Sequence, residues 1–306
     1  MHDRDTLHRF LFERFPIRGH LVHLDAAWRA LIEHRNYPEA IRQTLGEAVV
    51  ASLLLAATIK FEGVLSLQLQ GVGPMHLLLV QCTSGLGVRG LARHRDLPAG
   101  ISHDIRDLIG AGNLTVTLET DDGAQRYQGI VPIEGERLAG SLQAYFQNSE
   151  QLPTRLWLHA DAGGASGMLL QKLPGSGTLP AAAADAAANA AAIEDAWARV
   201  QLIGDTLTPE ELRTLADAEI LHRLFNEDDL RLFEPSPVYF RCRCSRERVA
   251  GMLQGLGEAE TRSVIAERGK VEVHCDFCNR AYVFDPVDVE QLFKAPVAAD
   301  SGGSLH

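Results

Sequence analysis

The chain has 306 residues, of which 46% are hydrophobic, so it is long enough for two or three domains and a substantial core. Its formal net charge of −11 argues against a general nucleic-acid or anionic-membrane binder, because phosphate surfaces repel it. The start of the sequence has no apolar signal-peptide core, and the longest nearly uninterrupted apolar run, 49–59, is too short to span a bilayer. Five cysteines, four of them clustered, do not form a secreted disulfide framework, so we expect a cytoplasmic protein with reduced thiols.

Residues 1–175 are predicted to form one α+β domain with a mixed, mostly antiparallel sheet. Strict alternation over 64–70 indicates a half-buried strand with Leu65, Leu67 and Leu69 on one face. Other apolar or alternating segments predict strands at 75–82, 113–120, 125–132, 156–159 and 168–173. Helices are predicted at 26–34, 38–60 and 135–150. Many short strands joined by tight turns favour an α+β domain over a regular βαβ repeat.

Residues 176–235 are predicted to be a metastable helical linker. The linker includes an alanine-rich run, 181–192, which favours helix but offers almost nothing to bury. Thr208, Pro209 and Glu211 then present an N-cap, a proline at the first helical position and a capping-box glutamate. A narrow apolar stripe follows, made of Leu212, Leu215, Ile220, Leu221, Leu224 and Phe225. Because residues 205–234 also hold nine acidic residues and three arginines, we expect this segment to be thinly packed.

Residues 236–294 contain two close cysteine pairs, Cys242 with Cys244 and Cys275 with Cys278, separated by 30 residues. Two such pairs predict a tetrahedral cage of four thiolates suited to one Zn²⁺ per chain. The cage carries a local charge of about −2. Five nearby arginines can offset that charge, namely Arg241, Arg243, Arg246, Arg248 and Arg280.

The rest of this C-terminal region has few residues with which to build a core. Helices are predicted at 245–256 and 261–268, and strands at 271–274 and 281–284. Metal binding is therefore expected to supply much of the folding free energy of a small zinc domain. Residues 295–306 are expected to be a disordered tail.

The four cysteines support two interpretations, an inert zinc staple and a redox switch, because each pair is close enough in sequence to form a local disulfide if the metal leaves. Cys82 is a lone thiol in an apolar strand and is predicted to be core packing. His274 adjoins Cys275, but four thiolates already fill the tetrahedron. The sequence has no phosphate-binding loop, nucleophile elbow or Cys/His nucleophile arrangement, so we expect no catalytic residues, no nucleotide and no enzyme activity.

The order of the motifs resembles the 33-kDa heat-shock chaperonin family, the heat shock protein 33 homologues. A Cys-x-Cys pair and a Cys-x-x-Cys pair near the end of a chain of this length carry the resemblance. Further segments resemble that family at 7–13, 68–75, 126–129, 149–155, 167–171, 242–248 and 274–278. The alanine-rich run departs from the family pattern. The resemblance implies a redox-regulated, ATP-independent holdase of the bacterial cytosol that keeps unfolding proteins from aggregating under oxidative stress.

The resemblance also implies a mechanism. Zn²⁺ holds the four thiolates in the reduced protein, and oxidation to Cys242–Cys244 and Cys275–Cys278 disulfides releases the metal. The segment 205–234 then unfolds and exposes apolar surface to unfolded client proteins, and reduction reverses the change. Members of the family dimerise when active, so we expect a homodimer that binds neither nucleic acid nor membrane. The alternative is a zinc-ribbon interaction module with inert structural cysteines, for which the arginine cluster is the best support.

Overall fold

The structure is a computed structural model that describes residues 4–98, 100–121, 123, 126–174 and 186–294. The chain divides into two compact units, residues 1–241 (unit 1) and residues 242–306 (unit 2). Residues 181–185 of the alanine-rich run and the predicted C-terminal tail, 295–306, lie outside the described residues. Both units combine helices with mostly antiparallel strands, which confirms the predicted α+β class.

Unit 1 contains two sheets, and the first, sheet A, has the strand order β10-β1-β2-β9-β8, with β11 also pairing with β1. All of its pairs are antiparallel. The strands are β1 (Thr6–Phe12), β2 (Ile17–Leu24), β8 (Thr154–Ala160), β9 (Ala165–Lys172), β10 (Leu230–Leu232) and β11 (Ser236–Pro237). Sheet A therefore joins the start of the chain to segments more than 150 residues away.

The second sheet of unit 1, sheet B, has the order β12-β5-β4-β3-β6-β7. Its strands are β3 (Gly63–Gly71), β4 (Met75–Thr83), β5 (Gly87–His94), β6 (Gly112–Thr120), β7 (Arg126–Pro132) and β12 (Tyr239–Phe240). Only the short β12–β5 pair is parallel among the described strands. The alternation predicted for β3 is confirmed, since Leu65, Leu67 and Leu69 are fully buried.

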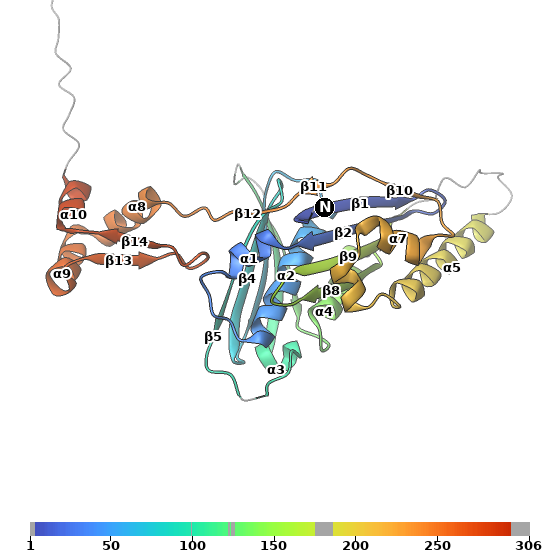
Figure 1. The fold of residues 1–306 in the computed structure, drawn as a ribbon, viewed down its shortest axis with the longest axis horizontal. Helices are drawn as coiled ribbons and strands as arrows, with labels where there is room; N and C mark the ends of the chain where they lie inside the picture. The colour runs from blue at the N-terminus through green and yellow to red at the C-terminus, as the bar shows by residue number, and fades with distance from the viewer. Residues whose placement is uncertain (1–3, 99, 122, 124–125, 175–185, 295–306) are drawn as a thin grey trace, which may run out of the picture. The chain divides into compact units, whose positions relative to one another are not determined.

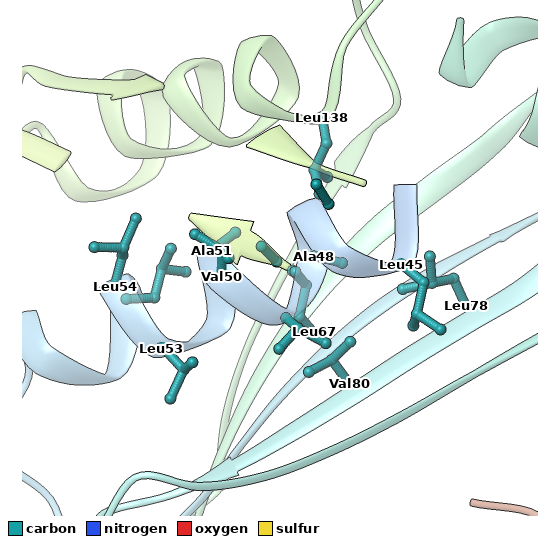
Figure 2. Packing of buried hydrophobic residues seen from close by; sticks show 14 of the residues in the cluster. Leu45, Ala48, Val50, Ala51, Leu53, Leu54, Leu67, Leu78, Val80 and Leu138 are labelled. Carbon is teal, nitrogen blue, oxygen red and sulfur yellow. The ribbon is translucent and has the colours of Figure 1, made fainter. Parts of the chain in front are cut away.

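Helix α2 (Glu39–Thr58) packs against strands of both sheets and forms the centre of the main core. Figure 2 shows Leu45, Ala48 and Leu53 of this helix together with Leu67, Leu78 and Val80 from sheet B. By length and composition α2 is apolar enough to cross a membrane, but most of it is buried inside unit 1. Most of the apolar run 49–59 therefore belongs to the core of unit 1.

Three shorter helices complete this part of unit 1. They are α1 (Ala26–Ile32), α3 (Ile105–Ile109) and α4 (Leu138–Tyr145), and α4 continues into a π-helical turn, Phe146–Glu150. The predicted helices at 26–34 and 135–150 correspond to α1 and to α4 with its π-helical turn. The helix α3 was not predicted because it has only five residues, too few to show a periodic apolar pattern.

The face of sheet A that points away from α2 is covered by α5 (Ala186–Gly204), α6 (Pro209–Thr214) and α7 (Asp217–Phe225), which lie beside its strands in Figure 1. The capping box predicted from Thr208 and Glu211 is present at the start of α6. The apolar stripe packs more extensively than the sequence suggested, because Leu212, Ile220 and Phe225 are at most 2% exposed. We call residues 186–232, which hold α5, α6, α7 and β10, the covering segment.

Unit 2 is a small α+β fold. It contains α8 (Arg246–Leu256), α9 (Glu258–Arg268), the hairpin β13 (Val271–His274) and β14 (Ala281–Phe284), and α10 (Pro286–Phe293). Among its described residues the buried cluster has five members, Leu253, Val271, Tyr282, Phe284 and Val289. The small size of this cluster agrees with the expectation that unit 2 has few residues with which to build a core.

Candidate metal centre

The four paired cysteines converge in unit 2. The Sγ atoms of Cys242, Cys244, Cys275 and Cys278 all lie within 4.8 Å of one another, and all four are half-buried free thiols. The closest contacts join one cysteine of each pair, with Sγ–Sγ distances of 3.5 Å for Cys242–Cys275 and 3.4 Å for Cys244–Cys278. The fold thus brings together residues that are more than 30 positions apart.

Local structure positions each pair. The first pair precedes α8, whose N-cap, Ser245, accepts a hydrogen bond from the backbone N–H of Arg248. The second pair occupies the turn between β13 and β14. There the Cys275 N–H donates to the Arg280 carbonyl at 3.0 Å, and the Asn279 N–H donates to the Cys275 carbonyl at 2.9 Å. Asn279 adopts a φ of 54°, a left-handed conformation that asparagine tolerates better than most residues.

The arrangement fits a tetrahedral zinc site. With Zn–S bonds of about 2.3 Å, the sulfur atoms of a Cys₄ site lie about 3.8 Å apart. The observed Sγ–Sγ distances, from 3.4 Å to at most 4.8 Å, bracket that value. Four thiolates leave no open coordination position, so a metal held here would be structural rather than catalytic.

Burial and hydrogen bonding shift the pKa values of Cys242, Cys244 and Cys278 in different directions. Burial opposes ionisation of Cys244, but hydrogen bonds from Tyr282 and the other cysteines outweigh it and lower the pKa of Cys244 to about 7. Burial and hydrogen bonds to its neighbours raise the pKa of Cys278 to about 12, and burial also raises the pKa of Cys242. A divalent metal must therefore displace protons from this cluster, so its affinity should rise with pH.

Tyr282 is a site residue that the sequence analysis missed. Its hydroxyl donates to the Cys244 Sγ at 3.1 Å, and that hydrogen bond is the main reason why the pKa of Tyr282 is raised to about 12. Alternation along β14 was the available signal, because it places Tyr282 and Phe284 on one buried face beside the cysteines.

Charge compensation falls mainly to one of the five arginines. A hydrogen bond with Tyr282 and the negative charges of Cys244 and Cys278 raise the pKa of Arg280. The positive charge of Arg280 therefore interacts favourably with the thiol cluster, as the sequence predicted. An exposed cation of this kind contributes modestly, since solvent screens it.

The other arginines have different contacts. Arg246 pairs with Asp288 at 2.7 Å, and Arg248 donates to the backbone carbonyl of Arg243 at 2.8 Å. Arg241 belongs to unit 1. The arginine cluster was the best support for an inert interaction module, because it could form a basic surface for a partner. That support is weakened, since Arg246 and Arg248 make contacts within unit 2.

The remaining candidates stay outside the cluster. The imidazole of His274 contacts the Glu272 carboxylate at 3.1 Å and is not among the grouped ligand atoms. Cys82 is fully buried in the core of unit 1, and burial raises the pKa of its thiol to about 12. A thiol held protonated in an apolar core is unreactive.

A second feature of functional interest is the apolar face of sheet A beneath the covering segment. Sheet residues Phe10, Phe12, Leu21, Met168 and Leu170 are buried there. The side chain of Phe225 meets Phe12 edge-on at a centroid distance of 5.2 Å. If the covering segment moved away, a contiguous apolar surface would be exposed to solvent.

A polar clamp holds the covering segment on this face. The Asp217 carboxylate, at the start of α7, contacts the Nδ1 atoms of His8 and His23 at 2.5 and 2.6 Å. The Nε2 atom of His23 lies 2.6 Å from the Leu212 carbonyl. Burial opposes ionisation of Asp217, but its contacts with the two histidines prevail and lower the pKa of the carboxyl well below its usual range. Sequence reasoning missed this clamp because its partners lie about 200 residues apart.

Comparison with known proteins identifies the family. The family model described as "Hsp33 protein" matches residues 5–285. The chain belongs to the Hsp33 family. It is 45% identical over 303 residues to the 33 kDa chaperonin of Methylobacillus flagellatus, covering 99% of both chains. It is 47% identical over 307 residues to the 33 kDa chaperonin of Nitrosococcus oceani, covering 100% of both chains.

The fold agrees with this assignment. The crystal structure of the 33 kDa chaperonin (heat shock protein 33 homolog) from Thermotoga maritima matches with a TM-score of 0.78. The match covers 94% of this chain and 98% of that chain at 22% sequence identity. The predicted family resemblance is therefore confirmed, and membership of the Hsp33 family supports a chaperone function rather than an enzymatic one.

Proposed function

We propose that this Hsp33-family protein is a redox-regulated, ATP-independent holdase of the bacterial cytoplasm. Its proposed role is to bind unfolding proteins and prevent their aggregation under oxidative stress. The observation that carries the proposal is the convergence of Cys242, Cys244, Cys275 and Cys278 in a unit with a five-residue buried cluster. In such a unit the order of the fold depends on the state of the thiols.

In the reduced state Cys242, Cys244, Cys275 and Cys278 would hold one Zn²⁺ per chain. The bound metal would supply deprotonation of the thiols and a cross-link between the two pairs. Peroxide then oxidises each pair. The two thiolates form an S–S bond and give two electrons to hydrogen peroxide, which takes up two protons and leaves as two waters. The oxidised cysteines would no longer hold the metal, because a disulfide sulfur is not a thiolate ligand.

The pairing of the disulfides decides what happens next. Cys242–Cys244 and Cys275–Cys278 disulfides each close a very short loop and leave the two pairs unlinked, so unit 2 loses the cross-link that orders it. Cys242–Cys275 and Cys244–Cys278 disulfides would join the two pairs covalently and keep unit 2 stapled. We propose the local pairing. Peptide mapping under non-reducing conditions distinguishes the two.

Chain continuity couples unit 2 to the covering segment. One residue, Arg241, separates Cys242 from β12, and β12, β11 and β10 are attached by two or three residue pairs each. Short edge strands with so few pairs have little stability of their own. Disorder that begins at Cys242 can therefore spread into residues 186–232 and uncover sheet A.

The uncovered face of sheet A is the proposed client surface. Aromatic and aliphatic side chains there offer about 1.5–3 kcal/mol each on burial, which suits non-directional binding of unfolded chains. The covering segment carries more acidic than basic residues, which should keep complexes soluble. Unfolded proteins are the proposed partners, a homodimer is the proposed active form, and no nucleotide, nucleic acid or membrane takes part.

Light scattering of an unfolding client protein tests this function. With no nucleotide present, the peroxide-oxidised protein should suppress scattering at near-stoichiometric ratios, and the reduced zinc-loaded protein should suppress it weakly. Equal protection by the two forms would exclude the switch. If neither form protects the client while both retain zinc, the alternative of an inert zinc-ribbon interaction module takes its place.

A further inference from the structure

A small pocket lies in unit 1 where sheet A extends past the C-terminal end of α2. It has a volume of about 230 Å³ and is lined in part by Arg9, Arg18, His20, Ala57 and Phe233. This volume lies below the usual range for drug-sized ligands, so the pocket suits a small ligand.

The β-ladder gathers the charged residues on one face. In the β1–β2 register Arg9 pairs with His20, and the next pair on the same face includes Arg18. Among the described residues no carboxylate pairs with Arg9 or Arg18 within 4 Å, although the whole chain has a net charge of −11. Two uncompensated guanidinium groups in a small cavity favour an anion.

Arg18 and His20 interact with the end of α2, but these interactions leave some of their side-chain nitrogen atoms without a partner among the described residues. The Arg18 Nη2 donates to the Thr58 carbonyl at 3.0 Å, and its Nε donates to the Gln171 Oε1 at 3.0 Å. The backbone of Ala57 also interacts with the His20 ring. These contacts cap the end of α2. Capping does not engage the Arg18 Nη1 and does not involve Arg9.

The helix end reduces the positive charge of the pocket without cancelling it. A helix C-terminus contributes about −0.5 charge, against about +2 from the two guanidinium groups. The pocket therefore keeps roughly +1.5. This balance favours a monovalent or divalent oxyanion over a neutral ligand.

His20 adds chemical selectivity. Its side chain is 2% exposed, and its Nδ1 atom has no hydrogen-bond partner within the described chain. Burial, together with the charges of Arg18 and Arg9, lowers the pKa of His20 to about 3, so the ring is neutral at physiological pH. In the neutral tautomer that keeps its proton on the other ring nitrogen, Nδ1 carries a lone pair and accepts a hydrogen bond.

We infer that this pocket binds a phosphate group that carries a proton, with its bare oxygens held by Arg9 and Arg18 and its P–OH donating to the Nδ1 atom of His20. Sulfate has the same shape but no proton at neutral pH, so it would leave Nδ1 facing an oxygen lone pair. An unpaired buried acceptor of this kind is costly. The site should therefore prefer phosphate to sulfate.

Calorimetric titration of the reduced full-length protein in chloride buffer at constant ionic strength tests the inference. Inorganic phosphate should bind with a stoichiometry of one, about tenfold or more tighter than sulfate. Absence of saturable phosphate binding would overturn the site. Equal affinity for the two anions would overturn the role of His20. Both results are independent of the proposed redox switch, because the protein stays reduced throughout.

Matched variants sharpen the test. Arg9→Gln should weaken phosphate binding about tenfold, since it removes one charged donor from an exposed position. Arg14→Gln makes the same charge change at an exposed residue outside the pocket and should leave phosphate binding unchanged. Equal effects of these two variants would reduce the inference to a general charge effect and overturn it.

His20→Leu tests selectivity, because it removes the Nδ1 acceptor and leaves Arg9 and Arg18 in place. Its folding is checked by thermal unfolding, and its preference for phosphate over sulfate should disappear. A preserved preference would contradict the assigned role. Titration with glycerol 3-phosphate beside inorganic phosphate then shows whether the site takes the free ion or a phosphate monoester, according to which binds more tightly.

Discussion

The cores of the two units differ in how much they bury along each helix. In unit 1, α2 buries 15 of its 20 residues between two sheets. In unit 2, α8, α9 and α10 bury one residue each, Leu253, Thr261 and Val289. The first core can order its surroundings by apolar burial alone, whereas the second needs a further cross-link. Under the proposed function, the chemistry of the four thiols in the less buried unit decides whether that unit is folded.

The largest effect is expected from removing half of the thiol cluster. Cys275→Ser combined with Cys278→Ser should abolish stoichiometric zinc binding and unfold unit 2, because two thiolates cannot complete the tetrahedron. Metal analysis and circular dichroism measure the two losses. Amide hydrogen exchange of α2 in unit 1 should keep its native protection.

Cys82→Ala provides the control for the cysteine variants, since it removes a thiol from the core of unit 1. Zinc content should be unchanged in this variant. Stoichiometric zinc retained by the double variant would show that the ligands lie elsewhere and would remove the contrast between the two units.

The next largest effect concerns the covering segment, which packs against sheet A in unit 1. Phe225→Ala should loosen this segment by about 3–5 kcal/mol, because it deletes a buried ring that packs against Phe12. Reduced protein with this change should suppress client aggregation without oxidation. Leu202→Ala, at a position in α5 that is 71% exposed, should behave like the wild type. Identical activity of both reduced variants would argue against sheet A as the client surface.

The third effect concerns the stability of unit 1, which we expect to depend on pH. Burial raises the pKa of Glu47 to about 7, against an opposing effect of Arg137. A carboxyl whose folded-state pKa is raised binds a proton more tightly in the folded state, so stability falls as pH rises from about 4.5 to 7. Glu47→Gln should therefore stabilise unit 1 at pH 8 by about 2–3 kcal/mol relative to its effect at pH 4.

Urea unfolding followed by tryptophan fluorescence measures this difference, since Trp28, Trp157 and Trp197 all lie in unit 1. Glu33→Gln, at a residue whose side chain is 66% exposed, is the control and should show no such dependence on pH. A stabilisation by Glu47→Gln that is the same at both pH values would mean that Glu47 does not titrate in this range.

The smallest effect is expected at Arg246, which ties α8 to the rest of unit 2. Its guanidinium lies over the Phe284 ring at 4.2 Å and pairs with Asp288. Arg246→Gln should cost about 1 kcal/mol and weaken zinc binding by about fivefold, which competition with a chelator measures. Arg262→Gln removes an exposed pair on α9 and should have no measurable effect.

Some of this arrangement could be predicted from the sequence because the signals were local. The alternating leucines of β3, the capping box at Thr208 and the spacing of the cysteine pairs each occupy a few consecutive residues. The family assignment followed from several such motifs in order. Local patterns of this kind need no knowledge of the tertiary structure.

The first two strands were missed because their pattern depends on distant partners. Strand β2 is buried on both faces, since α2 covers one face of sheet A and the covering segment the other. It therefore shows no alternation, and it carries polar residues such as His23, whose ring contacts Leu212 and Asp217 far along the chain. The extensive packing of the covering segment was underestimated for the same reason, because its apolar stripe meets a surface built from the chain's first strands.

Amide hydrogen exchange of the reduced zinc-loaded and peroxide-oxidised protein tests the central claim most directly. Oxidation should remove protection from residues 242–294 and from the covering segment, 186–232, because both depend on the thiol cluster. Helix α2 and strands β3 to β7 of sheet B should keep their protection, since their core does not depend on the thiols. Equal protection of residues 186–232 in the two redox states would contradict an order–disorder switch.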